Sequence, residues 1–117
     1  MTIFEKLDNA IAPLSVPWYD HMPEFAEGQE DPEFLCYSLY DNAKLFGDGS
    51  EQITRYFITL SAFARSSSAS DALRDRAAAA LKGAGFIRSG GEYGVSRDFP
   101  SYYRRMEEYT YDLDLEI

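Results

Sequence analysis

The spacing of apolar and polar side chains predicts three strands in this chain. Residues 109–116 alternate strictly between apolar side chains and polar or acidic ones, a period of two that is typical of a strand with one buried face. Residues 52–65 also alternate, and Phe57 and Phe63 on the second face indicate that this face is partly covered as well. The aromatic run over residues 34–40 predicts the third strand.

Helical periodicity predicts two helices. Over residues 2–12, apolar side chains recur at helical spacing, and Thr2 with Glu5 has the spacing of a capping box, in which each side chain satisfies a backbone N–H at the helix start. Residues 66–86 (SSSASDALRDRAAAALKGAGF) hold the clearer helix. Ser68 supplies its start signal, and one of the glycines in KGAGF suits the left-handed position that ends a helix.

These elements predict a single α+β domain over residues 1–117. A short strand from residue 86 and a last strand over about residues 103–116 complete the order α-β-β-α-β-β. The prediction is an antiparallel or mixed sheet of about four strands packed with two helices. Between Met106 and Tyr109 the apolar parity switches, which predicts a bulge or bend in the last strand.

Residues 13–33 hold four of the five prolines and predict an irregular segment wrapped over the body. The segment is too apolar for a disordered linker, and long irregular segments are often functional. It is expected either to contact a partner or to pack on the domain's own sheet.

The charge balance argues against nucleic-acid binding. Eleven basic and twenty acidic residues give a net charge of −9. Binding through phosphates needs a basic stripe, and none is present. No apolar run approaches a membrane span and no signal peptide is visible, so we expect a soluble protein made and kept in a cytoplasm, with no membrane partner.

The candidates for catalysis are weak. The sequence has one histidine, His21, and no motif that resembles a nucleophile elbow. The one cysteine, Cys36, lies among apolar residues. The paired glycines lack the spacing of phosphate-binding loops. We therefore expect no enzyme, and assign no catalytic residue, metal or cofactor.

Three carboxylates follow one face of the last strand: Asp112, Asp114 and Glu116. Same-face neighbours are roughly 6.5–7 Å apart, which spreads them too widely to converge on one metal ion. Two interpretations remain open. The row is either a solvated face that protects the strand from unwanted pairing or a surface that repels phosphates.

Aromatic residues exceed what one small core needs, with nine tyrosines and eight phenylalanines. Tyrosine is enriched at protein–protein interfaces, so the surplus predicts an oligomeric or partner-binding protein. The residues predicted for the interface are Trp18, Tyr19, Phe25, Phe57, Phe63, Tyr102 and Tyr103.

Over roughly residues 17–116 the chain resembles the small tail-terminator (tail-completion or head–tail joining) proteins of long-tailed bacteriophages and prophages. The stretches that carry the resemblance are PWYDHMPEF, EFLCYSLYDNAKLFGDGSE, ITRYFITLSAFAR, LKGAGF and YYRRMEEYTYDLDLE. The chain departs from the commoner pattern at SRDFPS, where such proteins have an acidic stretch and a Thr-Gly turn.

The resemblance implies an α+β subunit of a ring, often a hexamer, at the head-proximal end of the tail tube. Such a ring stops tube polymerisation and contacts the head's connector, which implies location in the virion tail or neck and no catalytic residues. Two alternatives remain: a small acidic binding module that mimics phosphates to inhibit a DNA-binding protein, and another head–tail or baseplate component.

Overall fold

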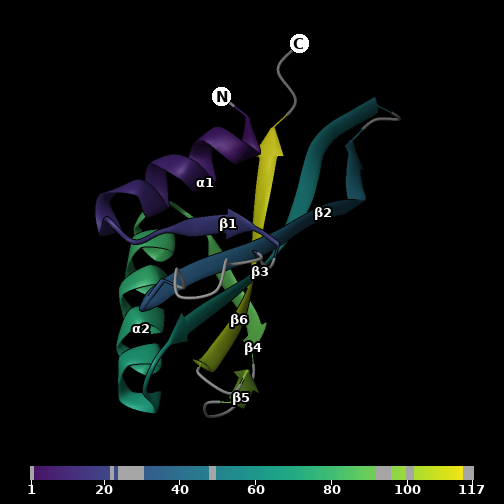
Figure 1. The fold of residues 1–117 in the computed structure, drawn as a ribbon. Helices are drawn as coiled ribbons and strands as arrows, with labels where there is room; N and C mark the ends of the chain where they lie inside the picture. The colour runs from purple at the N-terminus through teal and green to yellow at the C-terminus, as the bar shows by residue number, and fades with distance from the viewer. Residues whose placement is uncertain are drawn as a thin grey trace.

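A computed structural model describes residues 2–21, 23, 31–47, 50–91, 96–99 and 102–114. Side chains are not described at 41–47, 50–53, 96–99 and 114. In these residues the protein is an α+β domain, which confirms the predicted class (Figure 1). The helices are α1 (Ile3–Ile11) and α2 (Ser67–Gly83), with a 3-10 turn η1 (Ala12–Leu14); the strands are β1 (Trp18–Asp20), β2 (Glu33–Gly47), β3 (Ser50–Ala64), β4 (Ile87–Gly91), β5 (Ser96–Phe99) and β6 (Tyr102–Asp114).

The strands form one mixed sheet in the order β1-β2-β3-β6-β4. β1 pairs with β2 in parallel, and the other pairs are antiparallel. β5 also pairs with β6, beside the start of that strand. The predicted count of about four strands was therefore too low. β1 and β5 hold three and four residues, too few for an alternating pattern to show in the sequence.

Side-chain caps fix the first residues of the two helices. The capping box of α1 is confirmed: the Glu5 N–H donates to Thr2 Oγ1 (3.2 Å) and the Thr2 N–H donates to Glu5 Oε1 (3.3 Å). α2 starts two residues earlier than predicted, because Ser66 caps it by accepting the Ala69 N–H (3.1 Å).

The end of α2 fits the predicted glycine. Gly85 has a φ of +96°, its N–H donates to the Lys82 carbonyl and the Phe86 N–H donates to the Leu81 carbonyl. This pair of hydrogen bonds is a Schellman motif, in which a residue without a side chain most easily adopts the left-handed turn. The motif directs Phe86 back into the core beside Leu81.

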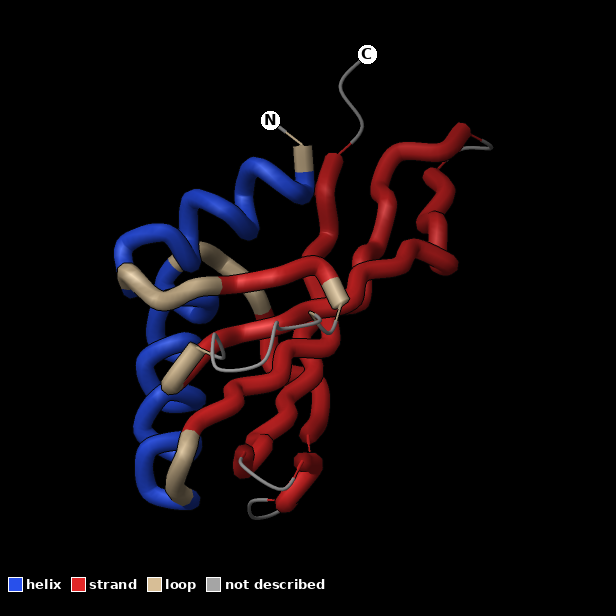
Figure 2. Tube along the Cα trace, viewed as in Figure 1, coloured by secondary structure: helices blue, strands red, loops and turns tan. Residues whose placement is uncertain are grey.

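Both helices cover the same face of the sheet, as Figure 2 shows. The core between the helices and the sheet is apolar. One buried hydrogen bond links α2 to β3: the Ser70 hydroxyl donates to the Ala62 carbonyl (2.8 Å). The buried core residues on this face are Ile3, Leu7, Ala10, Ile11, Val16, Leu35, Ile58, Leu60, Ala62, Leu73, Ala77, Leu81, Phe86 and Tyr109.

The opposite, helix-free face of the sheet is buried at one end. Phe34 and Phe63 stack there with ring centroids 4.8 Å apart, and Tyr102 meets both rings edge-on. Cys36 joins this cluster and Tyr19 packs against it. The partly covered second face that the sequence predicted on residues 52–65 is confirmed, since Phe63 is buried and Phe57 is half-buried.

No bulge interrupts the pairing of β6 with β3, so the predicted bulge or bend is not seen on that edge. The register runs unbroken from Ile53 opposite Asp114 to Ala64 opposite Tyr103. The apparent switch in parity arises because Glu107, a charged residue, occupies a buried position on the helix-covered face.

β2 and β3 continue past the body as a hairpin arm, defined here as residues 41–47 and 50–53. Past Ile53, the last residue of β3 that pairs with β6, β2 and β3 pair only with each other in the described residues. Figure 1 shows the arm projecting away from α2. The radius of gyration is 15.6 Å, against about 13 Å for a compact domain of this length. The tip of the arm therefore extends beyond the rest of the sheet.

Candidate functional site

The aromatic residues predicted for an interface lie in different environments. Phe63 and Tyr102 are buried, with 2% and 4% of their surface exposed, and belong to the cluster on the helix-free face. That burial assigns them to the core of the chain itself and corrects the prediction that they lie at a partner surface. Phe25 lies outside the described residues.

Trp18, Tyr19 and Tyr103 are half-buried. Trp18 packs on Tyr37 with ring centroids 4.7 Å apart, against the helix-side core. The Tyr19 hydroxyl donates to Asp31 Oδ2 (2.6 Å), an acceptor that raises the tyrosine's pKa. Tyr102 donates to the Asp31 backbone carbonyl. These contacts attach residue 31 to the helix-free face.

One aromatic pair on the same face joins a half-buried ring to an exposed one. Phe57 stacks on Tyr40 with ring centroids 5.2 Å apart and planes 11° apart, and Tyr40 is 53% exposed. The two residues lie directly opposite each other on β2 and β3, where the hairpin arm leaves the body. Of the predicted interface residues, Phe57 is the one that stacks on a ring more than half exposed, Tyr40. Tyr40 was not singled out in the sequence because it continues the aromatic run of a strand.

The predicted acidic face is only partly described. Asp112 lies on the helix-free face opposite Arg55, whose Nε and Nη2 donate to its two carboxylate oxygens at 2.7 and 3.0 Å. This bidentate pair lowers the pKa of Asp112 and neutralises its charge. The side chain of Asp114 is not described, and Glu116 lies outside the described residues.

Glu107 forms a buried charge cluster that the sequence analysis missed. Only 1% of Glu107 is exposed. Arg74 Nη1 from α2 donates to its Oε1 (2.6 Å), and Arg88 Nε from β4 donates to its Oε2 (2.9 Å). The Tyr109 hydroxyl also donates to Oε2 (2.9 Å). The cluster thus joins α2, β4 and β6, and both carboxylate oxygens are satisfied.

The cluster has a structural rather than a catalytic character. Burial, and then the hydrogen bond to Glu107, raise the pKa of Tyr109, so its hydroxyl remains a proton donor. Arg74 is further paired with Asp71 and Asp75 at 3.1 Å. Glu107 is almost fully buried and accepts three hydrogen bonds, from Arg74, Arg88 and Tyr109, so its carboxylate is engaged by contacts within the chain. The sequence holds one signal for this cluster: Glu107 and Tyr109 are two positions apart, so their side chains lie on the same face of the strand.

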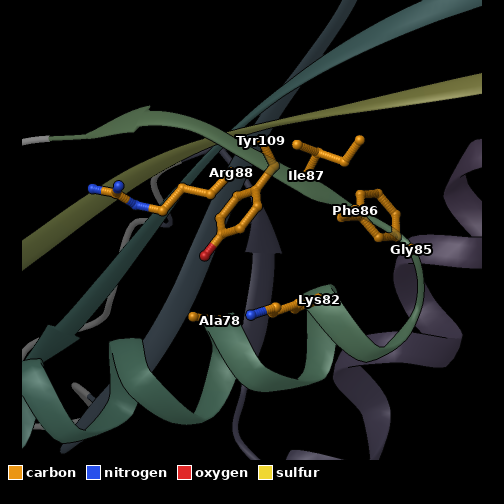
Figure 3. A pocket seen from close by; sticks show the side chains of 7 residues that line it. All are labelled: Ala78, Lys82, Gly85, Phe86, Ile87, Arg88 and Tyr109. Carbon is orange, nitrogen blue, oxygen red and sulfur yellow. The ribbon is translucent and has the colours of Figure 1, made fainter.

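A cavity of about 410 Å³ opens beside this cluster, between α2 and β4. Its floor is made by the buried rings of Phe86 and Tyr109, and Lys82, Ile87 and Arg88 stand exposed around it (Figure 3). Gly85 and Ala78 complete the lining. The cavity therefore combines an apolar floor with two cationic side chains, in a chain that is strongly acidic as a whole.

The described residues offer little for other chemistry. No three His, Cys, Asp or Glu side chains among them gather as a metal site. His21 is exposed and its Nδ1 lies 2.6 Å from Asp20 Oδ1; it also lines an open hollow of about 200 Å³ together with Cys36, Ser38 and Ser61. In the described part of the chain, the helices are too short or too polar to span a bilayer. No protein-family model and no curated protein matches the chain.

Proposed function

We propose that this chain is a structural subunit of a bacteriophage or prophage tail, a tail-terminator protein that forms a ring at the head-proximal end of the tail tube. The observation that carries the proposal is the hairpin arm, whose outermost pairs, Phe46 with Glu51 and Gly47 with Ser50, have no third strand beside them among the described residues. An isolated two-stranded hairpin is marginally stable in water, so an arm of this kind gains stability by docking on a neighbour.

The sheet supports the same proposal at its edges. The strand order ends with β1 on one side and β4 on the other, and neither has a further strand partner among the described residues. Because the two free edges differ, a contact that uses them would be head-to-tail. Such heterologous contacts close into rings when the rotation between subunits allows it.

The ring, a hexamer in the family that the chain resembles, would end tube growth and join the tail tube to the connector proteins of the head. The acidic composition supports a lumen that lets DNA pass, since a negative wall repels phosphates. Asp112 contributes little to that wall because Arg55 neutralises it. The support for a negative lumen wall is therefore the net charge of −9, and not the predicted row of carboxylates.

The observations favour this proposal over an inhibitor that mimics nucleic-acid phosphates. A mimic needs free carboxylates spread over one face. Two of the described acids on β6, Glu107 and Asp112, are instead held by arginines.

The proposal is tested by native mass spectrometry over a concentration series, with negative-stain images of the same samples. We expect a closed ring with a central hole, a hexamer by analogy with the family. Salt-sensitive binding of a basic DNA-binding protein by a monomer would support the mimic instead and contradict the ring.

A further inference from the structure

The cavity between α2 and β4 has the properties of a docking site. Ile87 is 67% exposed, more than Phe4 or Tyr40, the other large apolar residues that stand exposed in the described part of the chain. It lies on β4, at an edge of the sheet where the strand's outer backbone groups have no described partner. An apolar residue, an apolar floor and an open strand edge therefore coincide, and this combination suits an extended chain that adds to the edge.

The positive charge around the cavity favours an acidic ligand. Lys82 has no ion-pair partner among the described residues, and Arg88 adds a second cation whose charge is shared with Glu107. The site thus fits an extended segment with apolar side chains and an excess of carboxylates. In a protein with twenty acidic and eleven basic residues, a second copy of the chain is a ready source of such a segment.

Within this chain the hairpin arm matches that description. Residues 41–52 (DNAKLFGDGSEQ) contain three acidic residues and one lysine, with Leu45 and Phe46 between them. The arm projects away from α2 in Figures 1 and 2, so it does not reach the cavity of its own subunit. At the tip of the arm, the pairs Phe46–Glu51 and Gly47–Ser50 have no third strand beside them among the described residues.

We infer that the hairpin arm of one copy docks in the cavity between α2 and β4 of the next copy, placing apolar side chains beside Ile87 and Phe86 and carboxylates near Lys82. This inference rests on the proposed ring and specifies the contact that builds it. Because arm and cavity are different surfaces, each copy offers one of each, and the contact repeats around the ring.

The test uses two variants that damage opposite sides of the contact. Ile87→Asp alters the cavity rim at an exposed position, and Phe46→Ser alters the arm outside the body. Each alone is expected to weaken self-association by at least about 30-fold, the loss typical of an apolar anchor at an interface. Phe4→Asp, at the exposed apolar residue of α1, is the matched control and is expected to assemble like the wild type.

Mixing the two variants gives the decisive result. The arm of Ile87→Asp and the cavity of Phe46→Ser are both intact, so an equimolar mixture is expected to form heterodimers that cannot grow, visible by native mass spectrometry. A mixture that stays monomeric overturns the inference, as does an Ile87→Asp variant that assembles normally. A wild type that is monomeric at every concentration also overturns it.

The inference and the proposed function fail in different ways. If the wild-type ring caps tail tubes while Ile87→Asp and Phe46→Ser assemble normally, the inference is wrong and the proposed function stands. If the variants behave as expected but the wild-type ring leaves tail tubes uncapped, the contact stands and the terminator function is wrong.

Discussion

On the helix-covered face of the sheet, α1 and α2 bury the aliphatic side chains of β3 along much of the strand, whereas the helix-free face is closed at one end only. Phe63 and Phe34 are sealed there, while Phe57 and Tyr40, on the same two strands, stay accessible where the arm begins. The same aromatic pairing is therefore core at one end of the face and surface at the other. Exposure, rather than residue type, separates the residues that stabilise the fold from those available to a neighbour.

The largest expected effect separates the two ends of the helix-free face. Phe63→Ala should lower the free energy of unfolding by about 3–5 kcal/mol, because it opens a cavity in a packed cluster. Phe57→Ala, on the same strand and face, should cost about 1 kcal/mol because that ring is half-exposed. Urea denaturation measures both, and equal losses would show that the two ends do not differ.

The second prediction compares the stability effects of substituting two neighbouring residues of β6, one on the helix-covered face and one on the helix-free face. Glu107→Ala should destabilise the protein by about 3 kcal/mol, since it removes the carboxylate that joins α2, β4 and β6 and leaves the buried Tyr109 hydroxyl without its acceptor. Glu108→Ala, at the next, exposed position, should change stability by about 0.5 kcal/mol or less. If the two variants unfold at the same urea concentration, the Glu107 cluster does not join α2, β4 and β6 as described.

A third variant tests whether the open aromatic pair serves assembly. Tyr40→Ser should leave the free energy of unfolding within about 0.5 kcal/mol of wild type, as expected for an exposed residue. Self-association should weaken about tenfold if Tyr40 lies in a subunit contact. Sedimentation velocity measures the second quantity, with Phe4→Ser as control. Unchanged association would place this pair on a free surface.

The smallest expected effect concerns the exposed pair on the helix-free face. The pKa of Asp112 is lowered in the folded protein by Arg55, so the pair stabilises the fold above the unfolded carboxyl pKa of about 4 and this contribution is lost as the pH falls. Asp112→Asn should therefore unfold more like wild type at pH 3 than at pH 7. A larger difference at pH 3 would contradict the pairing.

Local patterns in the sequence were enough to predict the α+β class, the capping box at Thr2 and the glycine end of α2. These features depend on neighbours within a few residues. β1 and β5 were missed because they are short, and β1 is stabilised by pairing with the distant β2. Glu107 was missed for a related reason. Its position is decided by Arg74 and Arg88, which come near it only when the chain folds.

The candidate site was less predictable than the fold. Composition indicated an aromatic surplus but could not say which rings are buried, so Phe63 and Tyr102 were grouped with Phe57. The cavity beside Ile87 has no signature in the sequence at all, because its lining comes from α2, β4 and β6 and depends on how the three meet.

The most direct test of the central claim is a tube-termination assay with a tail-tube protein encoded in the same gene neighbourhood as this chain. Purified chain would be added while tubes polymerise, and tube lengths and ends would be scored by electron microscopy. The account predicts shorter tubes that carry a ring at one end only, with the effect lost in Ile87→Asp. Tubes of unchanged length with bare ends, at chain concentrations well above that of tube ends, would contradict it.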